Sequence, residues 1–95
     1  MYLVAEGKRR ENQLGYDMKK QEYVMYHHGV EMWREKGDVS LLDYFSDLRA
    51  NYGCIDEDEI AKLSTYPIWE KYCKTCEEEE AKLWKTLQLE KHLKA

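Results

Sequence analysis

Two cysteines three positions apart are the residues whose types and spacing most suggest chemistry. Cys73 and Cys76 lie in the stretch KYCKTCEEEE, directly before four glutamates. Paired thiolates can bind zinc or form a redox-active disulfide. A structural zinc site needs four ligands, commonly two separated pairs, and a second cysteine pair is missing here. Cys54 could supply a third ligand and His28 or His92 a fourth, but at no recognised spacing.

The same two cysteines also have a simpler interpretation. Residues three apart in a helix share one face, and the other residues on that face are apolar. A redox-active pair normally begins a helix, where the dipole lowers the thiol pKa, whereas Cys73 falls well inside the helix expected after Pro67. We therefore expect the pair to pack against a core, with no cofactor bound. A zinc site made by Cys54, Cys73 and Cys76 remains an alternative.

The adjacent histidines His27 and His28 are the other candidates for chemistry. In a helix their side chains point about 100° apart, so they cannot easily share one metal ion. A catalytic role would need a nucleophile or carboxylate that only the fold can supply. The sequence also has no glycine-rich phosphate loop and no HExxH motif. We expect no enzymatic activity.

Two acidic runs could mimic the phosphates of a nucleic acid. Residues 56–59 open a short predicted helix, where negative charge favours the helix dipole, and residues 77–80 circle most of a turn in the last one. Either run can simply be a solvated helix face. The alternative is that they occupy a nucleic-acid site on a target protein. The residues concerned are Asp56, Glu57, Asp58, Glu59, Glu77, Glu78, Glu79 and Glu80.

Aromatic residues are abundant, with eight tyrosines and three tryptophans in 95 residues. A core of this size uses only some of them, and tyrosine is enriched at the energetic centres of protein interfaces. Tyr16, Tyr23 and Tyr26 lie near the basic end of the first predicted helix. They are our candidate binding residues, and the alternative is that their rings cover the edge of the core.

A basic segment near the N-terminus offers a weaker, nucleic-acid-binding interpretation. Its members are Lys8, Arg9, Arg10, Lys19 and Lys20. The net charge of −4 opposes general binding to phosphates, and no nucleic-acid-binding motif accompanies the cluster. Nucleic acid is therefore a possible but less favoured partner.

The pattern along the chain predicts an all-α fold, a compact bundle of about four helices in a single helical domain, residues 1–95. Leu14, Met18, Met25 and Met32 recur near helical spacing, and one proline and five glycines are few for a β fold. The two long helices are expected at 10–36 and 68–93, and two short ones at 38–52 and 55–66. Residues 1–7 form a short N-terminal strand or arm.

These observations favour a non-catalytic protein-binding module that docks on a larger protein or protein complex. Small inhibitors and adaptors of phages and mobile elements are often built in this way. A homodimer through the apolar stripe of the last helix stays open. No run approaches the roughly 20 apolar residues of a membrane span, so we expect no membrane partner. Three cysteines without a secretory leader favour the cytoplasm.

Overall fold

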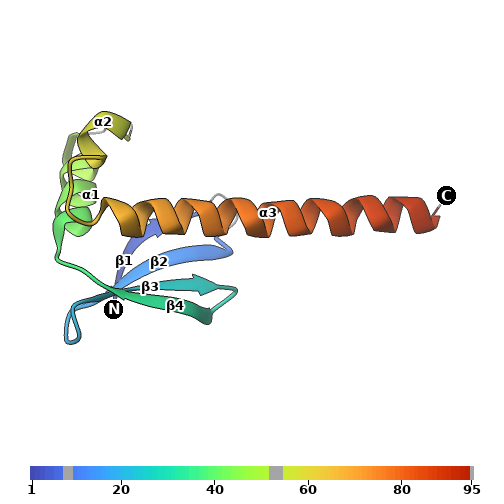
Figure 1. The fold of residues 1–95 in the computed structure, drawn as a ribbon, viewed down its shortest axis with the longest axis horizontal. Coiled ribbons are helices and arrows are strands. Elements are labelled where there is room, and N and C mark those ends of the chain that lie inside the picture. Colours follow the sequence, from blue (N-terminus) through green and yellow to red (C-terminus); the bar gives the residue numbers. More distant parts are fainter. Residues whose placement is uncertain (8–9, 52–54, 95) are drawn as a thin grey trace.

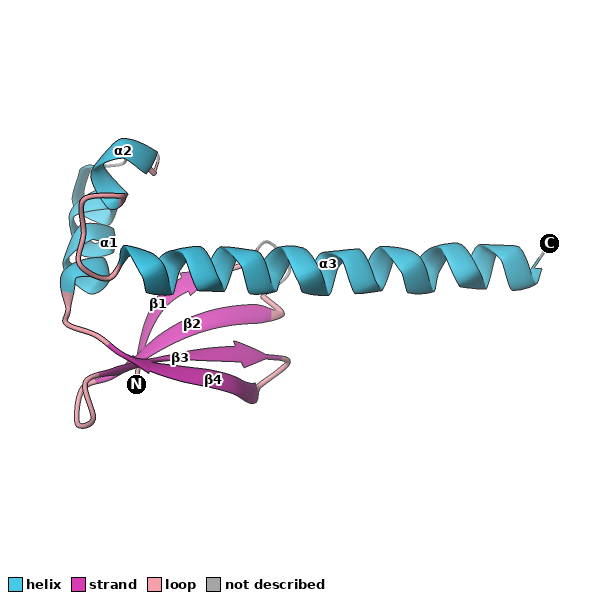
Figure 2. Cartoon of the chain, in the orientation of Figure 1, coloured by secondary structure: helices cyan, strands magenta, loops and turns pink. Residues whose placement is uncertain are grey.

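The chain folds into a four-stranded antiparallel sheet followed by three helices (Figures 1 and 2). This computed structural model describes residues 1–7, 10–51 and 55–94, without the side chains of residues 50–51, 84 and 86–94. The predicted all-α bundle is therefore wrong, because the fold is α+β. The elements are β1 (Tyr2–Glu6), β2 (Asn12–Asp17), β3 (Glu22–His27), β4 (Val30–Lys36), α1 (Ser40–Asn51), α2 (Glu57–Ile60) and α3 (Tyr66–Lys94).

The main correction concerns residues 10–36, which form three strands in place of the predicted long helix. Leu14 of β2 pairs with Met25 of β3, and Tyr16 pairs with Tyr23. All four are buried, so the residues that face the core recur at the period of two that a strand requires. The apolar spacing that suggested a helix came from side chains on different strands.

Two tight turns separate these strands, and both carry local signals. His28 and Gly29 have φ angles of 50° and 78°, the pair of positive values that a two-residue type I′ hairpin turn needs. Before β3, the Asp17 carboxylate accepts hydrogen bonds from the backbone N–H groups of Lys19 and Lys20. Gln21 then adopts a positive φ of 53°. These turns end any helix that might begin at residue 10.

One face of the sheet is covered by the first half of α3, which lies across it (Figure 1). Ile68, Trp69 and Tyr72 of α3 join the same buried cluster as Leu14 and Met25 of the sheet. With 29 residues, α3 is about 43 Å long, whereas a strand of five to seven residues spans only about 17–24 Å. The second half of α3 therefore extends past the sheet.

Helices α1 and α3 match the helices expected at residues 38–52 and 68–93, whereas the helix expected at 55–66 is reduced to the four residues of α2. Asp38 accepts hydrogen bonds from Ser40 and, at 2.6 Å, from the hydroxyl of Ser64. These hydrogen bonds, with the Ser40 side chain first, lower the pKa of the Asp38 carboxyl. Asp56 caps α2 by accepting from two backbone N–H groups of its first turn.

None of the helices in the described part of the chain has both the length and the apolar character needed to cross a bilayer.

Replacing Gly37 with alanine is expected to lower the free energy of unfolding by about 1–3 kcal/mol. A Cβ there would lie 2.7 Å from Ile68 Cδ1 and 3.0 Å from the Tyr23 ring, and Tyr23 is completely buried. Chemical denaturation followed by circular dichroism measures the loss. Gly7→Ala is the matched control, because its Cβ would meet nothing closer than 3.6 Å, and it should change stability by less than about 1 kcal/mol. Equal stability of the two variants would contradict the packing of α3 against this end of β3.

Candidate functional site

The structure splits the candidate tyrosines between the core and the surface. Tyr16 and Tyr23 are buried, and their hydroxyls donate to the backbone carbonyls of Gly37 (3.0 Å) and Asp38 (2.6 Å). Burial raises the pKa of Tyr23 to about 12. These two side chains fix the connection from β4 to α1 and offer no contact to a partner. Tyr26 is half-buried and lies on the outer face of the sheet, away from α3.

The two acidic runs are mostly solvated. All eight of their residues are exposed except Glu79, which is half-buried. Asp56 is occupied in capping α2, accepting from the backbone N–H groups of Asp58 (3.0 Å) and Glu59 (3.4 Å). The remaining carboxylates of these runs add negative charge to the surface but define no cavity.

The two described cysteines are free thiols packed against the core. Burial is the largest cause that raises the pKa of Cys73 to about 11, followed by Cys76 and the charges of Glu57 and Glu77. A raised pKa disfavours the thiolate, which is the form that attacks electrophiles and binds metals. In the part of the chain that the structure describes, no group of three or more His, Cys, Asp or Glu side chains could hold a metal ion. Cys54, the third residue of the zinc alternative, lies outside that part.

His27 fastens the sheet to α3. Its Nδ1 lies 2.7 Å from the side-chain oxygen of Asn12, and its Nε2 lies 3.4 Å from a carboxylate oxygen of Glu79. Glu79 also pairs with Lys82, and the ring of His28 meets that of His27 edge-on with centroids 4.4 Å apart. Through these two contacts, His27 connects β2 and β3 to α3.

The described basic residues do not gather in one place. Arg10 precedes β2 and pairs with Glu6 at 3.2 Å, whereas Lys19 and Lys20 lie in the turn after β2. The six residues of β2, about 20 Å, separate the two groups. Lys8 and Arg9 are outside the described residues. In the apolar stripe of the last helix considered for a homodimer, Trp69 belongs to the core of the same chain, and Cys73 and Cys76 pack against that core. The stripe's members Trp84 and Leu87 lie outside the described side chains.

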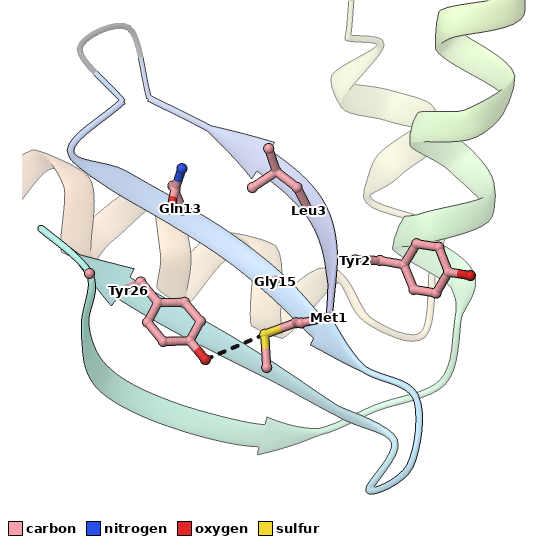
Figure 3. Close-up of a pocket in the computed structure, with 7 residues that line it drawn as sticks. Met1, Tyr2, Leu3, Gln13, Gly15 and Tyr26 are labelled. Atoms are coloured by element: carbon pink, nitrogen blue, oxygen red, sulfur yellow. Dashed lines mark hydrogen bonds between the residues drawn. The ribbon is translucent and has the colours of Figure 1, made fainter.

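The clearest surface feature is a set of three cavities around β1. One lies on the outer face of the sheet, has a volume of about 420 Å³ and is lined by Met1, Leu3, Gly15 and Tyr26 (Figure 3). The Tyr26 hydroxyl donates to the Met1 sulfur at 3.4 Å. A Cβ on Gly15 would lie 2.7 Å from that sulfur, so the absence of a side chain at this position leaves room for the Met1 side chain to lie against the sheet.

The other two cavities lie between β1 and the helices. Their volumes are about 420 Å³ and 320 Å³, and they adjoin, because Leu3, Phe45 and Arg49 line both. The first extends toward Met18, and the second toward Ile55. We call this continuous depression the β1 groove.

Exposed apolar side chains concentrate at the same three cavities. Eight large hydrophobic residues are exposed in the described part of the chain, and five of them line a cavity around β1. We call these five the β1 apolar surface: Met1, Tyr2, Leu3, Met18 and Ile55. The strand or arm expected at residues 1–7 is present as β1. Sequence reasoning missed this surface because it placed that strand in no sheet and put Met18 on a helix. The available signal was the run of apolar residues at the start of the chain, where only Val4 is fully buried.

No protein-family model, curated protein or solved structure matches the chain. The site is therefore interpreted from its own geometry.

In a Cys54→Ser background, Cys73 and Cys76 are expected to react with iodoacetamide about tenfold more slowly, or slower still, in the folded protein than in concentrated guanidinium chloride. Their raised pKa and packing both limit access to the thiolate. Mass spectrometry of samples quenched over time at mildly alkaline pH measures both rates. Equal rates in the folded and unfolded protein would contradict the packing. Stoichiometric zinc in the purified wild-type protein would instead support the metal alternative.

Proposed function

We propose that this protein is a non-catalytic protein-binding module that docks on a larger protein through the β1 apolar surface. The observation that carries the proposal is the concentration of exposed apolar side chains around one strand. Single exposed apolar residues are normal, but a contiguous exposed patch commonly marks an interaction site.

The chemistry of the surface suits protein recognition. Tyr2 is 58% exposed and offers a rigid ring with a polar hydroxyl, a combination enriched at interface hot spots. Met1 and Met18 are 65% and 50% exposed, and the flexible thioether side chain adapts to irregular partner surfaces. Tyr26 adds a half-buried ring at the edge of the outer cavity. These residues can bury apolar area without leaving an unpaired charge.

The opposite edge of the sheet carries a group of paired charges. Arg34 forms ion pairs with Asp17 and Glu22, both at 3.3 Å, and with Glu31. These hydrogen-bonded ion pairs raise the pKa of Arg34, with Glu31 the largest contributor. An apolar centre with a polar rim is the common arrangement of a non-obligate interface. The contrast between this paired, charged edge and the apolar residues at β1 supports placing the apolar centre of the interface at β1.

The acidic runs play a lesser part in the proposed module. Exposed charges contribute little to affinity individually, and they act mainly on the rate and selectivity of association. The version in which they occupy a nucleic-acid site on the target would make binding strongly dependent on salt. The β1 apolar surface, in contrast, predicts binding that depends only weakly on salt.

The double variant Leu3→Thr/Ile55→Thr should weaken binding of the natural partner about tenfold or more, because it removes two exposed apolar anchors. Wild-type protein immobilised as bait captures the partner from a lysate of its own cells, and the affinity of the purified partner is then measured for each variant. Val30→Thr/Val39→Thr is the matched control, since both residues are exposed apolar side chains that line none of the three cavities.

The control should change the affinity by no more than about twofold. Thermal unfolding checks that both double variants remain folded. Capture of nucleic acid alone, or equal effects of the two double variants, would show that the protein-binding proposal is wrong.

A further inference from the structure

The two edges of the sheet differ in how well they are protected. The strand order β1-β2-β3-β4 leaves one side of β1 and one side of β4 without a neighbouring strand. Four of the seven residues of β4 are charged, and charged side chains on an edge strand discourage the addition of another strand. In β1, only Glu6 is charged, at the strand's end. Both strands have a register shift, so charge is what distinguishes them.

The β1 groove runs beside this edge, where α1 contacts β1 but leaves the two adjoining cavities open. Strand addition gains affinity from backbone hydrogen bonds and specificity from pockets that take alternate side chains of the added strand. Side chains on the same face of a strand recur about every 7 Å. Two adjoining cavities of about 420 Å³ and 320 Å³ between β1 and α1 suit two such side chains, and Leu3 and Phe45 line both with apolar atoms.

Arg49 gives the groove a charge preference. It is exposed and lines both cavities, and it makes no ion pair with any residue in the described ranges. Glu6 lines the second cavity but is paired with Arg10, and Asp43 lines the first without reaching Arg49 as an ion pair. A guanidinium that has no ion-pair partner among the described residues, at the junction of two apolar cavities, is complementary to a carboxylate, which it can bind through two parallel hydrogen bonds.

From these observations we infer that the partner contributes a short, extended segment that adds to the free edge of β1. Its alternate apolar side chains enter the β1 groove, and an aspartate or glutamate of the segment pairs with Arg49. The inference rests on the proposed function and specifies its binding mode. A helical partner segment would satisfy neither the backbone groups of β1 nor the alternating pockets.

A phage-displayed library of random peptides, selected on the wild-type protein, provides the probe. Enriched peptides should show alternating apolar residues with an aspartate or glutamate, and synthetic copies should bind Arg49→Glu about tenfold or more weakly in fluorescence polarisation. Lys74→Glu is the charge-matched control, because Lys74 is an exposed cation of α3 that lines none of the three cavities. It should change the affinity by about twofold at most.

N-methylation of each peptide amide in turn tests the backbone contacts. Only every second N–H of an added strand faces β1, so affinity should fall at alternate positions and persist at the others. The inference is overturned if no peptide is enriched, if Arg49→Glu binds as well as wild type, or if N-methylation has no alternating effect.

These results separate the two proposals. A natural partner that is lost in Leu3→Thr/Ile55→Thr but binds Arg49→Glu normally, and that no selected peptide displaces, would leave protein binding in place and exclude strand addition. A partner lost in both variants and displaced by the selected peptides would support both.

Discussion

Burial of the inner face of the sheet beneath the first half of α3 is the interaction on which the rest of the structure depends. A sheet of four short strands has marginal stability unless its apolar face is covered. Trp69 and Tyr72 supply that cover as large rings with centroids 5.5 Å apart, and Tyr72 donates a hydrogen bond to the Asn12 carbonyl at 3.3 Å. On the β4 side, Lys71 contacts Glu35 at 2.5 Å and lies 4.7 Å from the centre of the Trp33 ring. Apolar burial therefore supplies the stability, and the polar contacts fix the angle of the helix on the sheet.

The position of α3 decides which surfaces remain available for binding. The first half of α3 covers one face of the sheet, so the outer face stays accessible, and β1 and β4 each have one side without a neighbouring strand. Phe45 of α1 meets Trp69 of α3 with ring centroids 5.2 Å apart, and this contact places α1 beside β1 without closing the space between them. The β1 groove thus follows from the way the core is packed. A substitution that loosened Trp69 would be expected to disturb both stability and binding.

The sequence was sufficient to predict the helical half of the fold and insufficient for the sheet. The acidic run at residues 56–59 and the apolar pattern after Pro67 are local signals; the structure contains α3 close to its expected bounds, and α2 in a shorter form than expected. The sheet depends on which residues of neighbouring strands pair with each other. The spacing of residues along the sequence does not show that Tyr16 of β2 pairs with Tyr23 of β3. The glycine at position 29, which adopts a positive φ in the turn, was the available local signal, but the single helix expected at residues 10–36 runs through it. The β1 groove was beyond sequence reasoning because its lining comes from β1, α1 and α3 together.

The length of α3 is explained by the same packing. An isolated helix of about a dozen residues has marginal stability in water, because forming the first turn is unfavourable while each further residue adds a hydrogen bond. In the half of α3 that lies on the sheet, buried side chains hold the helical turns in place, so the first turn is already formed. The second half then needs only to propagate, and the ion pair of Lys82 with Glu79 at 3.3 Å supports the point where the helix leaves the sheet. Glu79 also contacts His27, so the same carboxylate connects the sheet to the start of the extending half. The helix can therefore reach beyond the sheet without a second core, and the region around β1 keeps its apolar surface independently of it.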